Sequence, residues 1–275
     1  MPTRFRLSAA TSWTTEAGPG GTPLLFLGLL FWAFLLLPFA ALLLHISWPA
    51  LAREFSPVGL SPLAVSLLAT AAATLVIVLA GTPLAWLLAR GPGGVGRVVE
   101  ALLVIPLLTP PLVIGLLLVY LYGPYSFLGH LLALVRVSAT NTLWAVILAE
   151  IYEAAPYYIF AAQAAFSQVD PTVEQASLFL GVPPWHTWRR VTLPLAAPGL
   201  AVALSMAWAR AIGAFGAVIV VAYYPHGLPV ATWVALQEQG LPQALPLALL
   251  LILVALPFPL FTLWWRWRNR VPHQP

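Results

Sequence analysis

The sequence contains no cysteine and no lysine, and few of its residues are charged. Without cysteine the chain forms no disulfide and offers neither a thiolate nucleophile nor a cysteine-based metal site. Without lysine, Schiff-base chemistry and a phosphate-binding loop of the usual kind are excluded. Charged residues make up 7% of the 275 residues, against about a quarter in ordinary soluble domains. All twelve cations are arginines, and their placement along the chain reports the membrane topology.

Apolar residues make up 61% of the chain, more than a soluble fold of this length can bury, so the sequence predicts an integral membrane protein. A membrane-spanning helix needs about 20 apolar residues. Six continuous runs of that kind predict an all-α fold with six transmembrane helices: Leu24–His45, Leu60–Ala89, Val98–Tyr120, Asn141–Phe166, Gly199–Tyr223 and Ala244–Trp267. Continuous runs argue against a β-barrel, whose strands alternate apolar and polar residues.

Arginine placement predicts the orientation, because positive residues accumulate on the cytoplasmic side. With both ends in the cytoplasm, nine arginines lie inside, Arg53 and Arg136 lie outside, and Arg210 lies within the fifth span. We therefore predict an N-in, C-in protein of the cytoplasmic (inner) membrane.

This topology divides the chain into three parts. Residues 1–23 are expected to form a cytoplasmic tail, 24–267 the membrane domain and 268–275 a second cytoplasmic tail. The apolar run from Leu24 is too long for a signal peptide and no small-residue cleavage site follows it, so we expect a retained helix.

The longest polar stretch, residues 167–198, lies between the fourth and fifth spans. Asp170 and Pro171 suit the cap and first position of a helix, and Gly181 is placed to end it. By its pattern alone, this segment is either an amphipathic helix on the membrane surface or a docking element for a cytoplasmic partner.

The motif Gln175-Ala176-Ser177, then three residues, Gly181, nine residues and Val191-Thr192-Leu193-Pro194, resembles the EAA loop of ABC-importer permeases. That pattern is Glu-Ala-Ala, three residues, Gly, nine residues, Ile, any residue, Leu-Pro. This chain departs from it at Gln175 and Ser177, and the adjacent Glu174 is a candidate replacement for the missing acid. The resemblance implies a coupling helix within 167–194 that seats in a separate ATP-binding subunit, with coupling residues Glu174, Gln175, Ala176, Ser177, Gly181, Leu193 and Pro194.

The same resemblance implies the partners. The chain would pair with a second permease copy, as a homodimer, on two ATP-binding subunits that carry ATP and Mg, and an extracytoplasmic binding protein would deliver the substrate. We also expect contact with membrane lipid, and we expect no binding of nucleic acid. Because the chain has no Gly-rich phosphate loop, we expect no catalytic residue and no cofactor in it, and because its five histidines are scattered, we expect no metal.

A second resemblance concerns the substrate. Residues 208–217, Trp-Ala-Arg-Ala-Ile-Gly-Ala-Phe-Gly-Ala, are similar to a segment of molybdate and sulfate permeases that usually reads Ala-Arg-Ala-Leu-Gly-Glu-Phe-Gly-Ala. Ala214 stands where that family usually has Glu. The following Ala222-Tyr223-Tyr224-Pro225 looks like the tungstate/molybdate branch. The resemblance implies import of a tetrahedral oxyanion, tungstate or molybdate. A sulfate or thiosulfate permease is the alternative, and an ATP-independent secondary transporter a more distant one.

Three charged residues, Arg210, Glu150 and Glu153, are expected near the middle depth of the predicted spans. Charges at membrane depth face a bundle interior or a cavity. Arg210 therefore either attracts the anion in the pathway or pairs with one of the two glutamates. Prolines interrupt the third and fourth spans and predict either bent, gate-forming helices or irregular packing, at Pro106, Pro110, Pro111 and Pro156.

Overall fold

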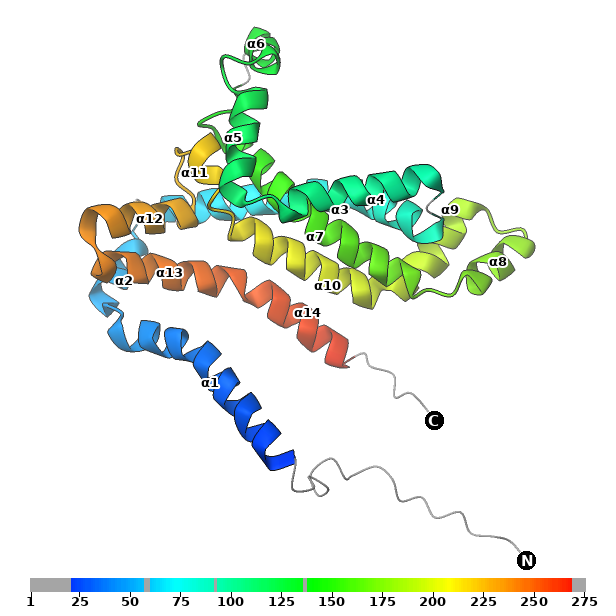
Figure 1. Ribbon diagram of the computed structural model, residues 1–275, viewed down its shortest axis with the longest axis horizontal. Coiled ribbons are helices and arrows are strands. Elements are labelled where there is room, and N and C mark those ends of the chain that lie inside the picture. Colours follow the sequence, from blue (N-terminus) through cyan, green and yellow to red (C-terminus); the bar gives the residue numbers. More distant parts are fainter. Residues whose placement is uncertain (1–20, 57–59, 92, 136–137, 269–275) are drawn as a thin grey trace, which may run out of the picture. The chain divides into compact units, whose positions relative to one another are not determined.

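The computed structural model describes residues 21–56, 60–91, 93–135 and 138–268, and the regular structure in these ranges is helical (Figure 1). The elements are α1 (Gly21–His45), α2 (Trp48–Glu54), α3 (Leu60–Arg90), α4 (Gly94–Leu108), α5 (Pro111–Tyr122), α6 (Phe127–Leu134), α7 (Leu143–Ser167), α8 (Pro171–Phe179), α9 (Pro184–Thr187), the π-helical turn η1 (Trp188–Thr192), α10 (Leu193–Ile212), α11 (Val218–Val221), α12 (Leu228–Gln239), α13 (Leu241–Ala255) and α14 (Pro257–Arg268).

Some predictions fall outside these ranges. Arg136 and residues 269–275 are not described, and neither are residues 1–20 of the predicted N-terminal tail.

The chain divides into two compact units, the first ending at Ile46 and the second beginning at Ser47. In the first unit α1 is apolar on all sides, and its side chains are almost all exposed in the single chain. Its stretch Leu24–His45 is long and apolar enough to cross a membrane, as predicted.

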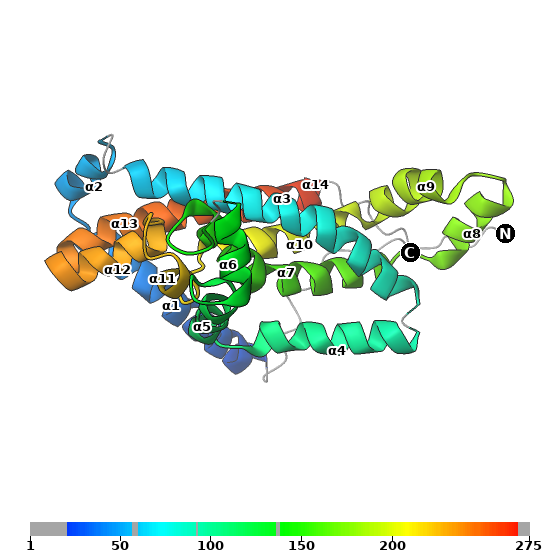
Figure 2. The ribbon, with the colours of Figure 1, turned by 90° about the horizontal axis from the view of Figure 1, so that it is seen from above.

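The centre of the second unit is formed by α3, α7 and α10, which lie side by side (Figure 2). Their contacting faces carry small residues, since Ala69, Ala73, Ala149, Ala154 and Ala203 are fully buried. Small side chains let membrane helices approach closely and gain van der Waals contact. Because the three helices come from distant parts of the sequence, this packing brings the predicted intramembrane charges together.

The predicted third span is broken into α4 and α5, whose axes differ by 108°. Pro110 and Pro111 cause the break, because proline lacks an N–H group and forces the preceding residue, Thr109, into an extended conformation. The Thr109 hydroxyl donates to the carbonyl of Ile105 at 2.7 Å and so closes the end of α4. The bend predicted at this place is therefore present, whereas α4 runs through Pro106 and α7 through Pro156 without interruption.

The predicted fifth span, Gly199–Tyr223, has the wrong bounds. The helix α10 begins earlier, at Leu193, and ends at Ile212, where Gly213 forms its C-cap. Residues 213–217 are non-helical and lead into the single turn α11. A Cβ on Gly216 would lie 2.7 Å from Pro111 Cβ, and a Cβ on Gly115 would lie 2.8 Å from the Ala217 carbonyl oxygen. Glycine is thus required where the start of α5 meets this non-helical segment.

Beyond α11 the chain forms a helix, α12, where no span was predicted. Its first residue, Leu228, donates its backbone N–H to the Ser66 hydroxyl of α3 at 2.8 Å. The apolar residues of α12 pack against α13, and α13 with α14 covers the predicted sixth span as the apolar stretch Leu241–Trp265.

Five helices of the described residues are long and apolar enough to cross a membrane, or six if the bent pair α4–α5 is one span. This confirms the prediction of an all-α membrane protein at the level of five to six candidate spans.

Candidate functional site

The polar segment between α7 and α10 is built from two short helices and a π-turn. The Asp170 carboxylate accepts the Thr172 N–H at 2.9 Å and caps α8, and this bond holds the pKa of Asp170 below its usual value. Leu180 is the C-cap of α8, and Gly181 follows with a φ of +78°, a conformation that glycine adopts without strain. The chain then turns through α9 and η1 into α10, whose first turn contains Pro194.

A network of charged hydrogen bonds holds α8 against the bundle. Arg90, the last residue of α3, donates from Nε to Glu174 Oε2 at 2.8 Å and from Nη2 to Glu174 Oε1 at 2.7 Å. Its Nη1 donates to the carbonyl oxygen of Phe166 in α7 at 3.1 Å. The Thr192 hydroxyl of η1 donates to Glu174 Oε1 at 2.6 Å. Bidentate arginine–carboxylate pairs are strong and fix geometry, so one carboxylate ties α8 to α3 and η1.

Sequence reasoning assigned Arg90 only to the charge count that set the topology. Its position at the end of a long apolar run could have marked Arg90 as a candidate site residue. The sequence does not show, however, which acid it faces. Glu174 was considered as a contact to a partner, and its carboxylate is instead engaged within this chain.

The outer surface of α8 and its turn is exposed and partly apolar. Gln175 and Ala176 are exposed, and Phe179 and Leu180 are 90% and 84% exposed. Ser177 points the other way, with its hydroxyl 3.0 Å from that of Thr187 in α9. An exposed apolar patch on a polar segment is typical of an interaction surface. The other predicted coupling residues, Gly181, Leu193 and Pro194, lie at the turn after α8 and at the start of α10.

The second charged centre lies where α10 ends. Arg210 Nη2 is 2.7 Å from Glu153 Oε2 of α7, and the guanidinium lies over the Tyr157 ring, 5.7 Å from its centroid. The other oxygen of Glu153 accepts the N–H of Ala217 at 3.1 Å. Non-helical backbone inside a membrane bundle needs such partners, so Glu153 serves both the arginine and the non-helical segment after α10. Arg210 is in the last turn of α10 rather than in the middle of a longer helix, as the predicted span had implied.

Glu150 lies one turn earlier on α7 and does not contact Arg210. Its Oε1 accepts the hydroxyl of Thr70 in α3 at 3.3 Å. Its other oxygen and the Thr74 hydroxyl are buried and have no hydrogen-bond partner among the described residues. The structure thus separates the two glutamates that the sequence had grouped: one pairs with Arg210 and the other with the polar face of α3.

The architecture defines a class: a helical, multi-pass membrane protein whose polar segment α8–η1 is tied to the helix bundle through Arg90 and Glu174. Residues 81–266 match the family described as "Binding-protein-dependent transport system inner membrane component". The chain belongs to this family of ABC-transporter permeases. It is therefore a transport subunit of the inner membrane rather than a catalytic one, and membership implies an ATP-binding subunit and a binding protein as partners.

Several curated relatives are similar over most of their length. A probable molybdenum ABC transporter permease protein of Haloferax volcanii is 41% identical over 236 residues, which is 86% of each chain. A molybdate/tungstate transport system permease protein of Thermococcus kodakarensis is 30% identical and covers 70% of this chain and 72% of its own. A probable sulfate transport system permease protein of Chlorokybus atmophyticus is 31% identical, with 68% and 67% covered.

A solved structure agrees on the fold. In the crystal structure of a bacterial alginate ABC transporter in complex with an alginate-pentasaccharide-bound periplasmic protein, one chain superposes with a TM-score of 0.70 at 19% identity. The match covers 87% of this chain and 92% of that one. At this identity the likeness concerns the fold alone.

Proposed function

We propose that this chain is the permease of an ATP-driven importer for tungstate or molybdate. The observation that carries the coupling part of this proposal is the clamp on α8, in which Arg90 and Glu174 join the docking helix to the ends of α3, α7 and η1. A partner that moves α8 therefore moves three elements of the bundle together.

In this mechanism the exposed side of α8 meets the ATP-binding subunit. Gln175, Ala176, Phe179 and Leu180 supply an accessible, partly apolar contact surface. Apolar side chains that become buried at an interface contribute most of its free energy. Glu174 acts from behind this surface: it holds the helix in position, and Ser177 supports the turn through Thr187. Closure of two ATP-binding subunits would then swing the bundles between inward-open and outward-open states.

The membrane part of the proposal concerns Arg210. Its guanidinium makes one charged contact, remains 27% exposed in the single chain and lies at the end of a transmembrane helix. Arginine has five N–H donors, and the donors that Glu153 does not occupy suit a tetrahedral oxyanion. We assign Arg210 to the anion pathway and Glu153 to its positioning. Glu150 hydrogen-bonds to Thr70 of α3 rather than to Arg210, and we assign it to the packing of α3 on α7.

The topology supports the same arrangement. With N-in, C-in orientation, α8, α9 and η1 face the cytoplasm together with Arg90, Arg189 and Arg190, as the positive-inside rule requires. The terminal segments 1–23 and 268–275 would be cytoplasmic tails around a membrane domain of 24–267.

We further propose that two copies of this chain pair on two ATP-binding subunits, and that the break at Pro110 and Pro111 forms a gate. ATP and Mg belong to the partner subunits.

Reconstitution tests the substrate. The chain, its ATP-binding subunit and its binding protein are placed in vesicles, and ATP-dependent uptake of tungstate, molybdate and sulfate is measured. We expect uptake of tungstate and molybdate, with sulfate poorly transported. Sulfate or thiosulfate as the best substrate would select the second candidate function, which the 31% identity to a sulfate permease relative favours. Uptake in vesicles that lack nucleotide and partner proteins would overturn the proposal.

A separate experiment tests the docking segment. Deleting residues 174–181 removes most of α8 and should release the ATP-binding subunit during purification. Copurification at normal stoichiometry would show that the subunit docks elsewhere.

A further inference from the structure

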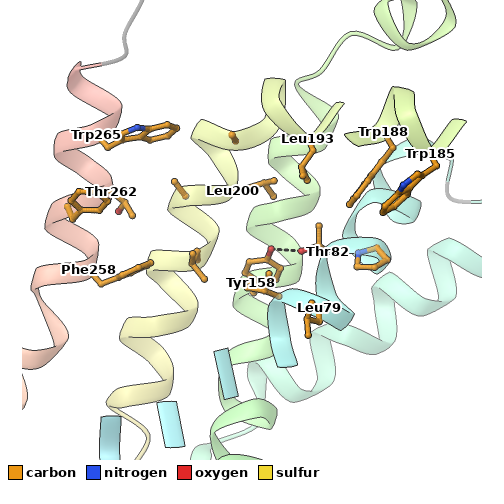
Figure 3. A pocket seen from close by; sticks show the side chains of 16 residues that line it. Leu79, Thr82, Tyr158, Trp185, Trp188, Leu193, Leu200, Phe258, Thr262 and Trp265 are labelled. Atoms are coloured by element: carbon orange, nitrogen blue, oxygen red, sulfur yellow. Dashed lines mark hydrogen bonds between the residues drawn. The ribbon is translucent and has the colours of Figure 1, made fainter. Parts of the chain in front are cut away.

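A second site lies between the helices at the loop end of the bundle and has no place in the transport mechanism above. It is a cavity of about 710 Å³ formed by α3, α7, α9, η1, α10 and α14. Binding pockets for small molecules fall in the range of about 300–1,000 Å³, so the cavity is large enough for a ligand. Figure 3 shows side chains from all of these elements pointing into it.

The chemistry of the lining excludes an ion. No charged side chain lines the cavity among the described residues, and most of the surface is aliphatic or aromatic. The Thr82 and Tyr158 hydroxyls are 2.6 Å apart and satisfy each other. The Thr262 hydroxyl bonds to that of Ser205 and to the carbonyl of Pro259. The indole Nε1–H of Trp188 is buried and has no hydrogen-bond partner among the described residues. One neutral donor without a charged group beside it does not offset the desolvation of an oxyanion, so a mainly apolar ligand fits.

The two ends of the cavity differ. Figure 3 shows the indole side chains of Trp185, Trp188 and Trp265 toward one end and Phe258 and Leu79 toward the other. Tryptophan is enriched where a membrane meets water, because its ring is apolar and its N–H is polar. The indole end therefore lies at headgroup level, and the Phe258 end lies among acyl chains.

Exposed arginines are close neighbours, in the chain, of the indole residues that line the cavity. Arg189 and Arg190 directly follow Trp188 and are exposed. Arg268 is also exposed, and its guanidinium lies 5.5 Å from the Trp264 ring, one residue from Trp265. Basic residues beside a pocket between transmembrane helices attract anionic lipid headgroups.

We propose that this cavity binds an anionic phospholipid, with an acyl chain between α10 and α14 and the headgroup on Arg189 and Arg190. Bound in this way, the lipid joins the loop that follows α8 to α14 and supports the coupling segment from the membrane side. The proposal goes beyond substrate transport and does not depend on which oxyanion is carried.

The test uses the permease copurified with its ATP-binding subunit. The complex is exposed to vesicles of equal parts phosphatidylglycerol and phosphatidylcholine, extracted in mild detergent, and examined by native mass spectrometry with lipid quantification. We expect phosphatidylglycerol to be retained over phosphatidylcholine by at least about fivefold, the effect of one arginine near an anionic headgroup. Retention of neither lipid, or of both equally, would overturn the proposal.

Paired variants locate the lipid. Ala201 lines the cavity, and Ala201→Phe should fill it and remove most of the retained phosphatidylglycerol. Ala101 is exposed on α4, so Ala101→Phe is the matched control and should retain the lipid. The double change Arg189→Gln and Arg190→Gln should lose the headgroup preference, whereas Arg97→Gln on α4 should keep it.

The melting temperature and subunit stoichiometry of each variant are measured beside lipid retention. A stable Ala201→Phe complex that still holds the lipid would overturn the assignment. Loss of permease pairing with lipid retention unchanged would identify a second copy as the occupant. Oxyanion uptake is measured separately, so failure of the lipid site and failure of the proposed transport function give different results.

Discussion

The two arginine–glutamate pairs of this chain differ in how completely the arginine is used. Arg90 donates from three nitrogens, two to Glu174 and one to a backbone carbonyl, and its side chain is 16% exposed. Arg210 makes one charged contact, lies over an aromatic ring and is 27% exposed. A fully engaged guanidinium fixes the position of a helix, whereas a partly engaged one keeps donors for another anion. This difference is the reason for proposing that Arg90 transmits force and that Arg210 belongs to the pathway.

The largest effect is expected from Arg210→Met. It removes the pathway cation and leaves Glu153 charged and unpaired inside the bundle, a loss of about 3–5 kcal/mol in free energy of folding. Oxyanion uptake into vesicles should fall to background, and the yield of assembled complex should fall with it. Arg53→Met, an exposed change on α2, is the matched control and should transport normally.

A double variant separates the two consequences. Combining Arg210→Met with Glu153→Gln removes both charges, while the Gln oxygen can still accept the N–H of Ala217. Assembly should then recover and uptake should remain absent. If uptake returned together with assembly, Arg210 would be purely structural and the contrast with Arg90 would disappear.

Arg90→Ala is expected to have the next largest effect. It removes three hydrogen bonds that position α8, worth together about 2 kcal/mol after allowance for partial exposure. Less ATP-binding subunit should copurify, and ATP hydrolysis should respond less to substrate-loaded binding protein. Arg97→Ala, at an exposed position in α4, is the control.

Exchanging the two residues, as Arg90→Glu with Glu174→Arg, should recover part of the coupling. Normal coupling in Arg90→Ala alone would contradict the proposed role of the Arg90–Glu174 pair.

Substitution of the glycines behind the Arg210 centre should have a smaller effect, on stability. Gly216→Ala and Gly115→Ala place a methyl group in contact with backbone atoms of the facing segment, and overpacking of this kind costs about 1–3 kcal/mol. The melting temperature of the complex should fall for both. Gly94→Ala meets nothing within 4 Å and should be neutral. Equal melting temperatures for all three would show that α5 does not rest on residues 216–217 in the membrane.

The smallest expected effect concerns the cap of α8. The Thr172 N–H lowers the pKa of Asp170, so the charged cap stabilises the helix fully above the usual pKa of an aspartate, and this contribution is lost as pH falls through the lowered value. The protection factors of the α8 amides, which compare measured hydrogen exchange with the intrinsic rate at each pH, should therefore fall at acid pH. Asp170→Asn keeps a capping oxygen without the titration and should remove this pH dependence. An unchanged profile in that variant would assign the effect to another group.

Several features could be predicted because they depend on local sequence. The apolar runs, the cap at Asp170, the turn at Gly181 and the break at Pro110 each follow from neighbouring residues, and each is present in the structure. The bounds of the fifth span were wrong because hydropathy stays high from Leu193 through Val221, while the helix α10 ends at Ile212. Hydropathy reports burial in lipid and does not report where backbone hydrogen bonds stop.

The sequence by itself determined the class of protein, since so apolar a chain has no stable place outside a membrane, and it also marked the polar segment that we propose meets a partner. Only the tertiary structure decided which acids the arginines face. Arg90 and Glu174 are far apart in the chain, as are Glu153 and Arg210, and close packing of α3, α7 and α10 through small side chains brings each pair within 2.7 Å. Charge pairing across a bundle depends on which helix faces touch, and that is a property of the packed molecule.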